Sequence, residues 1–498
     1  MASLHTAAAT SLSDHILCHF NPHSELPNHR QLYCILQAGI RDSALAPGLK
    51  LPPTRELAEA LGIARNTVVH VYEQLTLEGY VQAGVGRGTY VAETHPRLVA
   101  DRRPRPTAAA PGRARLSRRG SATVEHAGAG RLQWGAFTPG VPELRMFPVD
   151  VWRRLQSQLW RKPTPQQLTY ATGHGDPALR EAIAQYLQGT RGAVCSPEQV
   201  IVTSGTQQSL HLVAHLLADP GDAAWIEDPG YWGARSVFRA AGLALTPVAV
   251  DQEGLAPSAE QLRTPPRLMF VSPSNQYPTG AIMSHGRRTQ LLDYAAAHGV
   301  WIVEDDYDSE FRFRSRPLPA LQGLDQHRRV IYLGTFSKTL FPALRLSYLV
   351  LPPELVDDFA RASSELYREG QAPQQAVLAR FLSEGHYATY IRRMRTEYAA
   401  RHDALIQTIQ QRFGDQLPIM GGDAGLHLAL GLPQHVDDRA VVEEALQAGV
   451  TTRPLSMYYM RGRQPAATGG LLLGYGAVTE AEIGPAFKKL AKVVQRAL

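Results

Sequence analysis

Side chains of the kind that bind ligands follow three apolar stretches in the C-terminal two-thirds of the sequence. A glycine between hydroxyl residues follows the first stretch, a carboxylate ends the second, and hydroxyl residues, a lysine and an arginine follow the third. These residues are Ser204, Gly205 and Thr206, then Asp305, then Thr335, Ser337, Lys338 and Arg345. Free amides at a helix start can hold a phosphate, and an activated lysine can attack an electrophile. Each feature alone is common, but together they predict a site for a phosphorylated, electrophilic and protonatable ring.

Alternating strands and helices would bring these residues together. Apolar stretches of strand length alternate with amphipathic helical stretches such as 284–298, which predicts an α/β fold with a largely parallel sheet. Ligands of such sheets bind outside the carboxyl ends of the strands, where the residues above stand. The predicted strands cover 200–203, 224–227, 268–272, 300–305 and 330–334.

Pyridoxal phosphate has the chemistry that this set of residues would suit. It carries a phosphate, an aldehyde that forms a Schiff base with an amine, and a pyridine nitrogen that a carboxylate keeps protonated. We expect Lys338 to supply the amine and Asp305 to hold the ring nitrogen. Partial burial of Lys338 beside a cation such as Arg345 would favour the uncharged amine.

Length and composition set the broad class of protein. The chain has 498 residues, of which 44% are hydrophobic and 19% charged, so we expect two or three folded domains. Three scattered cysteines argue against a disulfide framework, and His211 and His215 have no third ligand at a suitable spacing, so we expect no metal site. No apolar run approaches the roughly 18 residues of a membrane span. We therefore expect a soluble, cytoplasmic protein with no membrane partner.

An arginine-rich stretch separates two parts of the chain. Residues 96–121 carry eight arginines against the single acid Asp101, together with four prolines. This composition cannot form a core, and it predicts a linker over 96–130. The charge could keep a spacer solvated or could contact a polyanion. The predicted domains are therefore 1–95 and 131–498, the latter with a small C-terminal subdomain from about residue 375.

The part before the linker has the pattern of a winged helix-turn-helix, with a core over about 30–93. Two short helices over 54–61 and 65–78 are joined by a tight turn, and two short strands then flank a glycine-rich tip. A recognition helix places its DNA contacts at its amino end. A small helical dimerisation module would show similar spacing. The candidate DNA contacts by placement are Arg55, Arg65, Asn66, Thr67 and Arg87.

This N-terminal part resembles the winged helix of GntR-type regulators. The resemblance rests on GLKLPPTRELA at 48–58, LGIARNTV at 61–68 and YEQL at 72–75. It implies double-stranded operator DNA as a partner. The contacts that it implies are Arg55, Arg65, Asn66, Thr67 and the wing residue Gly86.

The part after the linker resembles the aspartate-aminotransferase fold, also called fold type I, over roughly 132–498. The spacing of Asp305, Lys338 and Arg345 carries this resemblance. It implies that Tyr231 stacks on the ring of pyridoxal phosphate and that Asn275 and Tyr307 bond its phenolic oxygen. It also implies that Tyr170 reaches the phosphate of the neighbouring subunit. The phosphate-binding residues would be Ser204, Gly205, Thr206, Thr335, Ser337 and Arg345.

One position departs from this pattern. Aminotransferases of this fold carry an arginine for the substrate carboxylate on a late strand, and the corresponding run 471–476 (LLLGYG) has none. Arg453 is the best remaining candidate for binding an effector. A surface arginine before a proline is the alternative interpretation.

The whole chain resembles the MocR family of regulators. The resemblance implies a transcriptional regulator, a head-to-tail homodimer, that senses an amino acid, an amine or pyridoxal phosphate itself through the Schiff base of Lys338. Because the late-strand arginine is absent, we expect little or no full transamination. A working aminotransferase with an accessory DNA-binding domain is the alternative. A repressor without a cofactor fits less well, because Lys338, Asp305 and Arg345 are intact.

Overall fold

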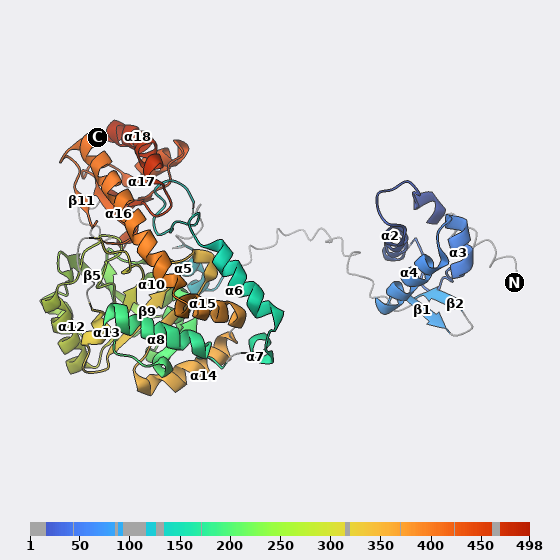
Figure 1. Ribbon diagram of the computed structural model, residues 1–498, viewed down its shortest axis with the longest axis horizontal. Helices are drawn as coiled ribbons and strands as arrows, with labels where there is room; N and C mark the ends of the chain where they lie inside the picture. Colours follow the sequence, from blue (N-terminus) through green and yellow to red (C-terminus); the bar gives the residue numbers. More distant parts are fainter. Residues whose placement is uncertain are drawn as a thin grey trace. The chain divides into compact units, whose positions relative to one another are not determined.

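A computed structural model shows an N-terminal unit, 1–115, and a C-terminal unit, 116–498 (Figure 1). The predicted contacts Gly86 and Arg87 and most of the predicted linker lie outside the described residues. In the part of the chain that is described, no helix is long and apolar enough to cross a membrane. The described residues are 16–42, 44–84, 88–92, 116–125, 134–170, 172–313, 319–368, 370–422, 424–460 and 469–498.

The N-terminal unit packs amphipathic helices over a two-stranded antiparallel sheet. Gly62 adopts the left-handed conformation (φ 65°) that ends the first helix of the pair, and the second helix begins three residues later. Leu57, Val68 and Leu75 lie in the shared core. The predicted helix-turn-helix is thereby confirmed. The elements are α2 (Asn28–Arg41), α3 (Thr54–Leu61), α4 (Arg65–Leu77), β1 (Val81–Gly84) and β2 (Gly88–Val91).

The C-terminal unit is built on an eight-stranded sheet of order β3-β10-β9-β8-β7-β4-β5-β6. Strands β5, β4, β7, β8 and β9 are parallel neighbours, whereas β10 runs antiparallel to both β3 and β9. The prediction of a mainly parallel sheet is therefore confirmed. The strands are β3 (Val200–Thr203), β4 (Ala223–Asp228), β5 (Ala244–Asp251), β6 (Gly254–Leu255), β7 (Leu268–Val271), β8 (Trp301–Asp306), β9 (Val330–Thr335) and β10 (Ser347–Val350).

Helices cover both faces of this sheet. Helices α9, α10 and α14 share a core with one face, and α12 shares a separate core with the opposite face. The helices of the unit up to this point are α5 (Arg118–Glu125), α6 (Val149–Arg161), α7 (Pro165–Leu168), α8 (Pro177–Arg191), α9 (Thr206–Leu217), α10 (Trp232–Ala240), α11 (Ala259–Leu262), α12 (His285–His298), α13 (Leu321–Leu324), α14 (Val356–Tyr367) and α15 (Ala372–Ser383). Short 3-10 turns are η2 (Pro197–Gln199), η3 (Pro342–Leu344) and η4 (Pro353–Leu355).

A second, antiparallel sheet of order β11-β12-β14-β13 forms a small subdomain with the last helices of the chain, α16 to α18 (Figure 1). Phe137, from the start of the unit, forms an isolated bridge with Gly474 of β14, so the segment that follows the linker is tied to this subdomain. The elements are α16 (His386–Phe413), β11 (Ile419–Met420), β12 (His427–Gly431), α17 (Asp438–Gln447), β13 (Arg453–Pro454), η5 (Leu455–Tyr458), β14 (Gly470–Gly474) and α18 (Glu480–Ala497).

Candidate functional site

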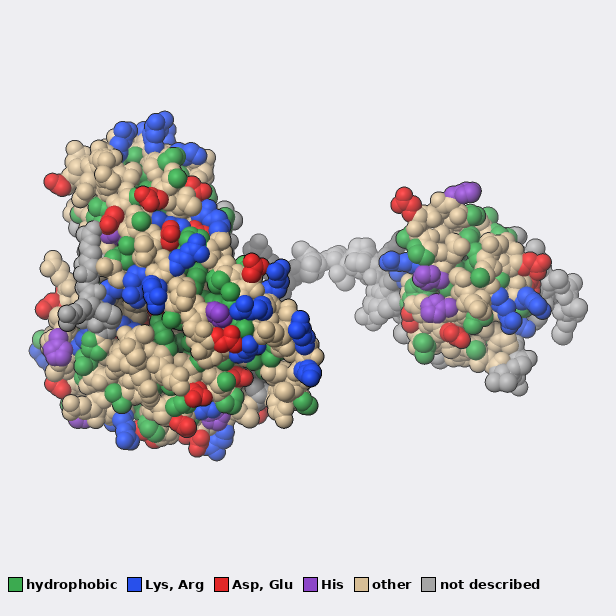
Figure 2. Space-filling view, viewed as in Figure 1, with side chains coloured by type: hydrophobic (Ala, Val, Ile, Leu, Met, Phe, Trp, Pro, Cys, Tyr) green, Lys and Arg blue, Asp and Glu red, His purple; other side chains and the backbone are tan. Residues whose placement is uncertain are grey.

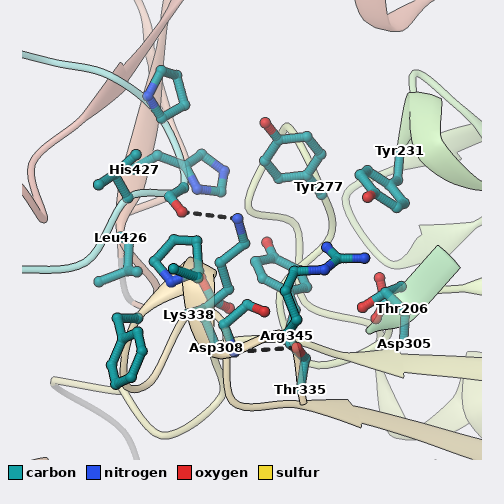
Figure 3. Close-up of a pocket in the computed structure, with 18 of the residues that line it drawn as sticks. Thr206, Tyr231, Tyr277, Asp305, Asp308, Thr335, Lys338, Arg345, Leu426 and His427 are labelled. Carbon is teal, nitrogen blue, oxygen red and sulfur yellow. Dashed lines mark hydrogen bonds between the residues drawn. The ribbon is translucent and has the colours of Figure 1, made fainter. Parts of the chain in front are cut away.

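A cavity of about 980 Å³ opens between the large sheet and the small subdomain. The ends of β8 and β9 supply one side of it, and residues 426–427 and Arg453 supply another (Figure 3). On the face of the C-terminal unit that Figure 2 shows, positively and negatively charged side chains are interspersed. Most of the predicted cofactor residues meet here. Those that line the cavity are Thr206, Tyr231, Asp305, Tyr307, Thr335, Ser337, Lys338 and Arg345.

Lys338 stands in the loop after β9 and reaches across the cavity. Its Nζ donates a hydrogen bond of 2.8 Å to the carbonyl oxygen of Gly140. Burial lowers the pKa of Lys338 below its usual range; Asp308 opposes this shift, and the Arg453 guanidinium adds to it. The lysine is therefore closer to a nucleophilic amine than a solvated lysine would be.

Asp305 ends β8 with a buried side chain, 5% exposed. Its Oδ1 has no hydrogen-bond partner among the described residues. Burial raises its pKa well above the usual range, and Asp306, Glu227 and Asp308 raise it further. A buried acceptor with no donor is costly, so a cationic N–H donor placed in the cavity would stabilise the ionised carboxylate. The pyridine nitrogen of pyridoxal phosphate is such a donor.

A second feature of the cavity suits a phosphate. Gly205 caps α9 with φ 116°, and this helix start has no side-chain cap among the described residues. Arg345 packs against it so closely that a Cβ at Gly205 would lie 2.7 Å from the Arg345 Nη2. A helix amino terminus beside a guanidinium attracts anions. The missing side chain of Gly205 is what lets the two approach each other.

The predicted hydroxyl residues divide into two groups. Thr335 lines the cavity, and its Oγ1 accepts hydrogen bonds from the Ser347 hydroxyl (2.8 Å) and the Ser337 amide (3.2 Å). Ser204 is not among the cavity-lining residues, and its amide donates to the side chain of Gln208. The Ser337 side chain is therefore better placed than that of Ser204 to reach a phosphate.

Aromatic side chains form the walls beside the predicted ring position. The Tyr231 hydroxyl accepts a bond of 2.9 Å from Gln207, and burial raises its pKa to about 12. The Asn275 amide donates to the Tyr307 hydroxyl (3.2 Å) and to Asp308 Oδ1 (2.9 Å). Asn275 thus does not line the cavity itself but orients Tyr307, which does.

Several cavity residues were not predicted from the sequence. The hydroxyls of Tyr277 and Tyr458 are 2.9 Å apart, and the Tyr277 ring meets that of His427 edge-on at 5.1 Å. His427 Nε2 donates to the Pro278 carbonyl (3.2 Å), which leaves Nδ1 as an acceptor. Asp308 keeps an unpartnered buried Oδ2, within the described part of the chain. Only Asp308, beside the acids of β8, carried a signal in the sequence.

Arg453 lies on β13 and lines the cavity. Its register partner on β14 is Leu472, within the run where no arginine was found. The guanidinium therefore enters from the strand beside the run that lacks an arginine. Tyr170, by contrast, is 75% exposed after α7 and does not line the cavity of this chain.

The N-terminal unit presents its predicted DNA contacts at the start of α4. Arg65 and Asn66 are exposed and Thr67 is half-buried in the first turn, where no side chain caps the helix. Arg55 is exposed in the first turn of α3. The first turns of both helices of the helix-turn-helix thus carry accessible polar side chains and amides.

Each of the two units matches a known protein family. Residues 28–91 match the family of bacterial regulatory proteins of the gntR type, and residues 140–490 match the aminotransferases of class I and II. The chain is 41% identical to the probable rhizopine catabolism regulatory protein MocR of Rhizobium meliloti, over 91% of each chain. It is 30% identical to the pyridoxine biosynthesis transcriptional regulator PdxR of Corynebacterium glutamicum, over 92% of this chain and 94% of the relative.

Among solved structures, the chain is similar to the kynurenine aminotransferase of Pyrococcus horikoshii. The TM-score is 0.67 at 25% identity, covering 78% of this chain and 96% of that one. The two regulators are named for different processes, so the identity of an effector must come from the residues of this cavity.

The buried His427 gives the C-terminal unit a specific pH dependence. Burial lowers its pKa from 6.5 to about 4, so between these values the unfolded chain binds more protons than the folded one. The free energy of unfolding therefore decreases as the pH falls, and this group accounts for about 2 kcal/mol of the decrease between pH 7 and pH 5. Urea unfolding followed by tryptophan fluorescence measures it, since all six tryptophans lie after residue 130.

His427→Gln should remove this share of the pH dependence, and the exposed His285→Gln should leave it unchanged. Equal pH dependence in wild type and His427→Gln would contradict the assignment of a neutral, buried imidazole.

Proposed function

Since this chain belongs to the MocR family of DNA-binding transcriptional regulators, we propose that its C-terminal unit holds pyridoxal phosphate and senses a small amine or amino acid there. The observation that carries the proposal is Asp305, which lines the cavity that Lys338 enters and whose buried Oδ1 has no donor among the described residues. The gntR-type domain implies DNA binding. We also propose that the chain has domains at 1–95 and 131–498, joined by a linker.

Each group of the cavity has a distinct task in this proposal. Bound pyridoxal phosphate supplies an aldehyde that condenses with amines and a pyridinium ring that withdraws electrons. Asp305 holds the ring nitrogen, Arg345 and the start of α9 hold the phosphate, and Tyr231 packs on the ring. Lys338 offers the amine that a ligand amine must replace. The residues proposed to hold the cofactor are Ser204, Gly205, Thr206, Tyr231, Asn275, Asp305, Tyr307, Thr335, Ser337, Lys338 and Arg345.

Arg453 is proposed to bind an anionic group of the effector. It lines the cavity, and its positive charge acts to lower the pKa of both Lys338 and Tyr458. The aromatic residues Trp134, Tyr277 and Phe147 line the same cavity, which suits an effector with an apolar portion. An amino acid therefore matches the cavity better than a simple alkylamine does.

We propose that the protein works as a cytoplasmic homodimer, arranged head to tail. Tyr170 supports this arrangement, because a 75% exposed tyrosine that lies outside the cavity of its own chain is available to a second subunit. The proposed partners are operator DNA, an amine or amino-acid effector and a second copy of the chain. A catalytically active aminotransferase with an accessory DNA-binding domain is the competing function.

The cofactor assignment predicts a covalent attachment point. Purified protein should be yellow, and borohydride reduction should fix a pyridoxyl group on Lys338, located by mass spectrometry of the peptides. Lys338→Ala should lose the visible absorbance, and the exposed Lys162→Ala should keep it. Asp305→Asn should weaken cofactor binding about 10- to 150-fold, because a hydrogen bond to a charged group is lost. A pyridoxyl group on another lysine would refute the site.

The start of α4 predicts a loss of sequence discrimination. Arg65→Ala should weaken operator binding about 5- to 150-fold, the value of one base-edge contact, while binding to random DNA changes little. Arg41→Ala, at the far end of α2, serves as the matched control. Fluorescence anisotropy with operator and scrambled duplexes measures both affinities. An equal loss on both duplexes would assign Arg65 to the phosphate backbone instead.

A third experiment distinguishes regulator from enzyme. Oxo-acid production and operator affinity are followed on the same preparation with a panel of amines and amino acids. We expect at least one ligand to change the visible absorbance and the operator affinity, with turnover slow or limited to a half-reaction. Arg453→Gln should weaken the response to amino acids more than the response to amines. Fast multiple turnover with no ligand effect on DNA binding would establish the enzyme instead.

A further inference from the structure

The amine of Lys338 points away from the residues proposed to hold the cofactor. Figure 3 shows Tyr231, Asp305, Thr206 and Arg345 on one side of the lysine, while its hydrogen bond runs to the opposite side, toward Leu426 and His427. The acceptor is the Gly140 carbonyl, at 2.8 Å. A lysine nitrogen bonded to the cofactor would have to lie toward the first group of residues. The hydrogen bond therefore holds the amine on the side of the cavity away from these residues.

Gly140 is shaped for this contact. Its φ of 72° lies in the left-handed region, and a Cβ built on it would lie 2.9 Å from the Lys338 Nζ. A side chain at this position would thus strain the backbone and crowd the amine. The positive φ favours glycine at this position, and a methyl group there would force the flexible end of Lys338 to shift.

Gly140 belongs to a segment, 134–143, that is bonded to the small subdomain. The Phe137 carbonyl accepts from the Gly474 amide (2.9 Å), and the Ala136 carbonyl accepts from the Thr451 amide (3.1 Å). The Glu143 amide is 2.8 Å from the Tyr398 hydroxyl of α16. The bond from Lys338 therefore joins the loop after β9 to a segment that the small subdomain holds. In the sequence, this segment begins four residues after the end of the predicted linker.

We propose that the Gly140 carbonyl is the docking position of the Lys338 amine once another amine has taken its place on the cofactor, and that this bond braces segment 134–143. Gly140 is thus a positioning residue that converts ligand exchange into a change in segment 134–143. The inference rests on the proposed function, because it needs the cofactor on Lys338. In the exchange, the C=N bond to lysine breaks as one to the ligand nitrogen forms, and two hydrogens pass from the ligand nitrogen to the lysine.

The experiment uses the full-length protein with its cofactor and methoxyamine as the probe, since an oxyamine displaces lysine from an aldehyde without needing the natural effector. Visible absorbance reports the exchange, and hydrogen exchange with mass spectrometry reports the peptides that contain Thr138, Thr451 and Gly474. In wild type we expect methoxyamine to shift the absorbance and to slow exchange in these peptides ~5-fold, the effect of one added hydrogen bond.

Two variants isolate the contact. Gly140→Ala should show the absorbance shift without the slower exchange. Gly299→Ala is its control. Gly299 has a similar φ of 68°, but a Cβ built on it has no atom within 4 Å. This variant therefore reproduces the backbone strain without the contact, and we expect it to behave as wild type. Lys338→Met releases no amine and should also lack the slowing, which keeps the test valid if Gly140→Ala folds poorly.

The outcomes separate the two proposals. An absorbance shift in wild type with unchanged exchange in these peptides would overturn the role of Gly140 and leave the cofactor site standing. Slower exchange in Lys338→Met would overturn it as well, since no lysine amine is then involved. If wild type shows no visible absorbance to shift, both proposals fail.

Discussion

Three successive carboxylates at the end of one buried strand set the main constraint on the C-terminal unit. Glu304 and Asp306 point to one face of the sheet and Asp305 to the other, as strand alternation requires. Glu304 accepts from the two amides that open α13, at 2.7 and 2.8 Å, and Asp306 pairs with Arg191 of α8 at 2.7 Å. Burying an unpaired carboxylate is costly, so these partners hold α8 and α13 in place. Of the three, only Asp305 lines the cavity, and its Oδ1 has no hydrogen-bond partner among the described residues.

The small subdomain closes the opposite side of the cavity through contacts that leave no room for side chains. A Cβ at Gly474 would lie 2.2 Å from the Thr138 carbonyl, and one at Gly476 would lie 2.3 Å from the Val141 carbonyl. The backbone of segment 134–143 thus packs directly on the end of β14. Lys338, in the loop after β9, links the sheet to this segment through its hydrogen bond to the Gly140 carbonyl.

The sequence predicted what depends on local pattern. The predicted strand 200–203 coincides with β3, and the other predicted strands end within one residue of β4, β7, β8 and β9. Strands β5 and β10 were not predicted. The place of β10 depends on distant partners, because it pairs antiparallel with both β3 and β9. Gly140 and His427 were missed for the same reason. Nothing in the sequence around this glycine or this histidine indicates a position in the cavity. Asp305 and Lys338, by contrast, could be predicted because they lie at or just after the ends of predicted strands.

The register of β13 and β14 bears on whether ligand binding leads to turnover. Arg453 enters the cavity from the strand beside Leu472, and cross-strand partners have Cβ atoms about 5 Å apart. A carboxylate held by Arg453 would therefore be oriented differently from one held by an arginine at position 472. Proton transfer loses rate with misplacements of about 1 Å, so this difference matters for catalysis. A regulator needs only that the ligand bind two conformations unequally, which the displaced arginine still permits.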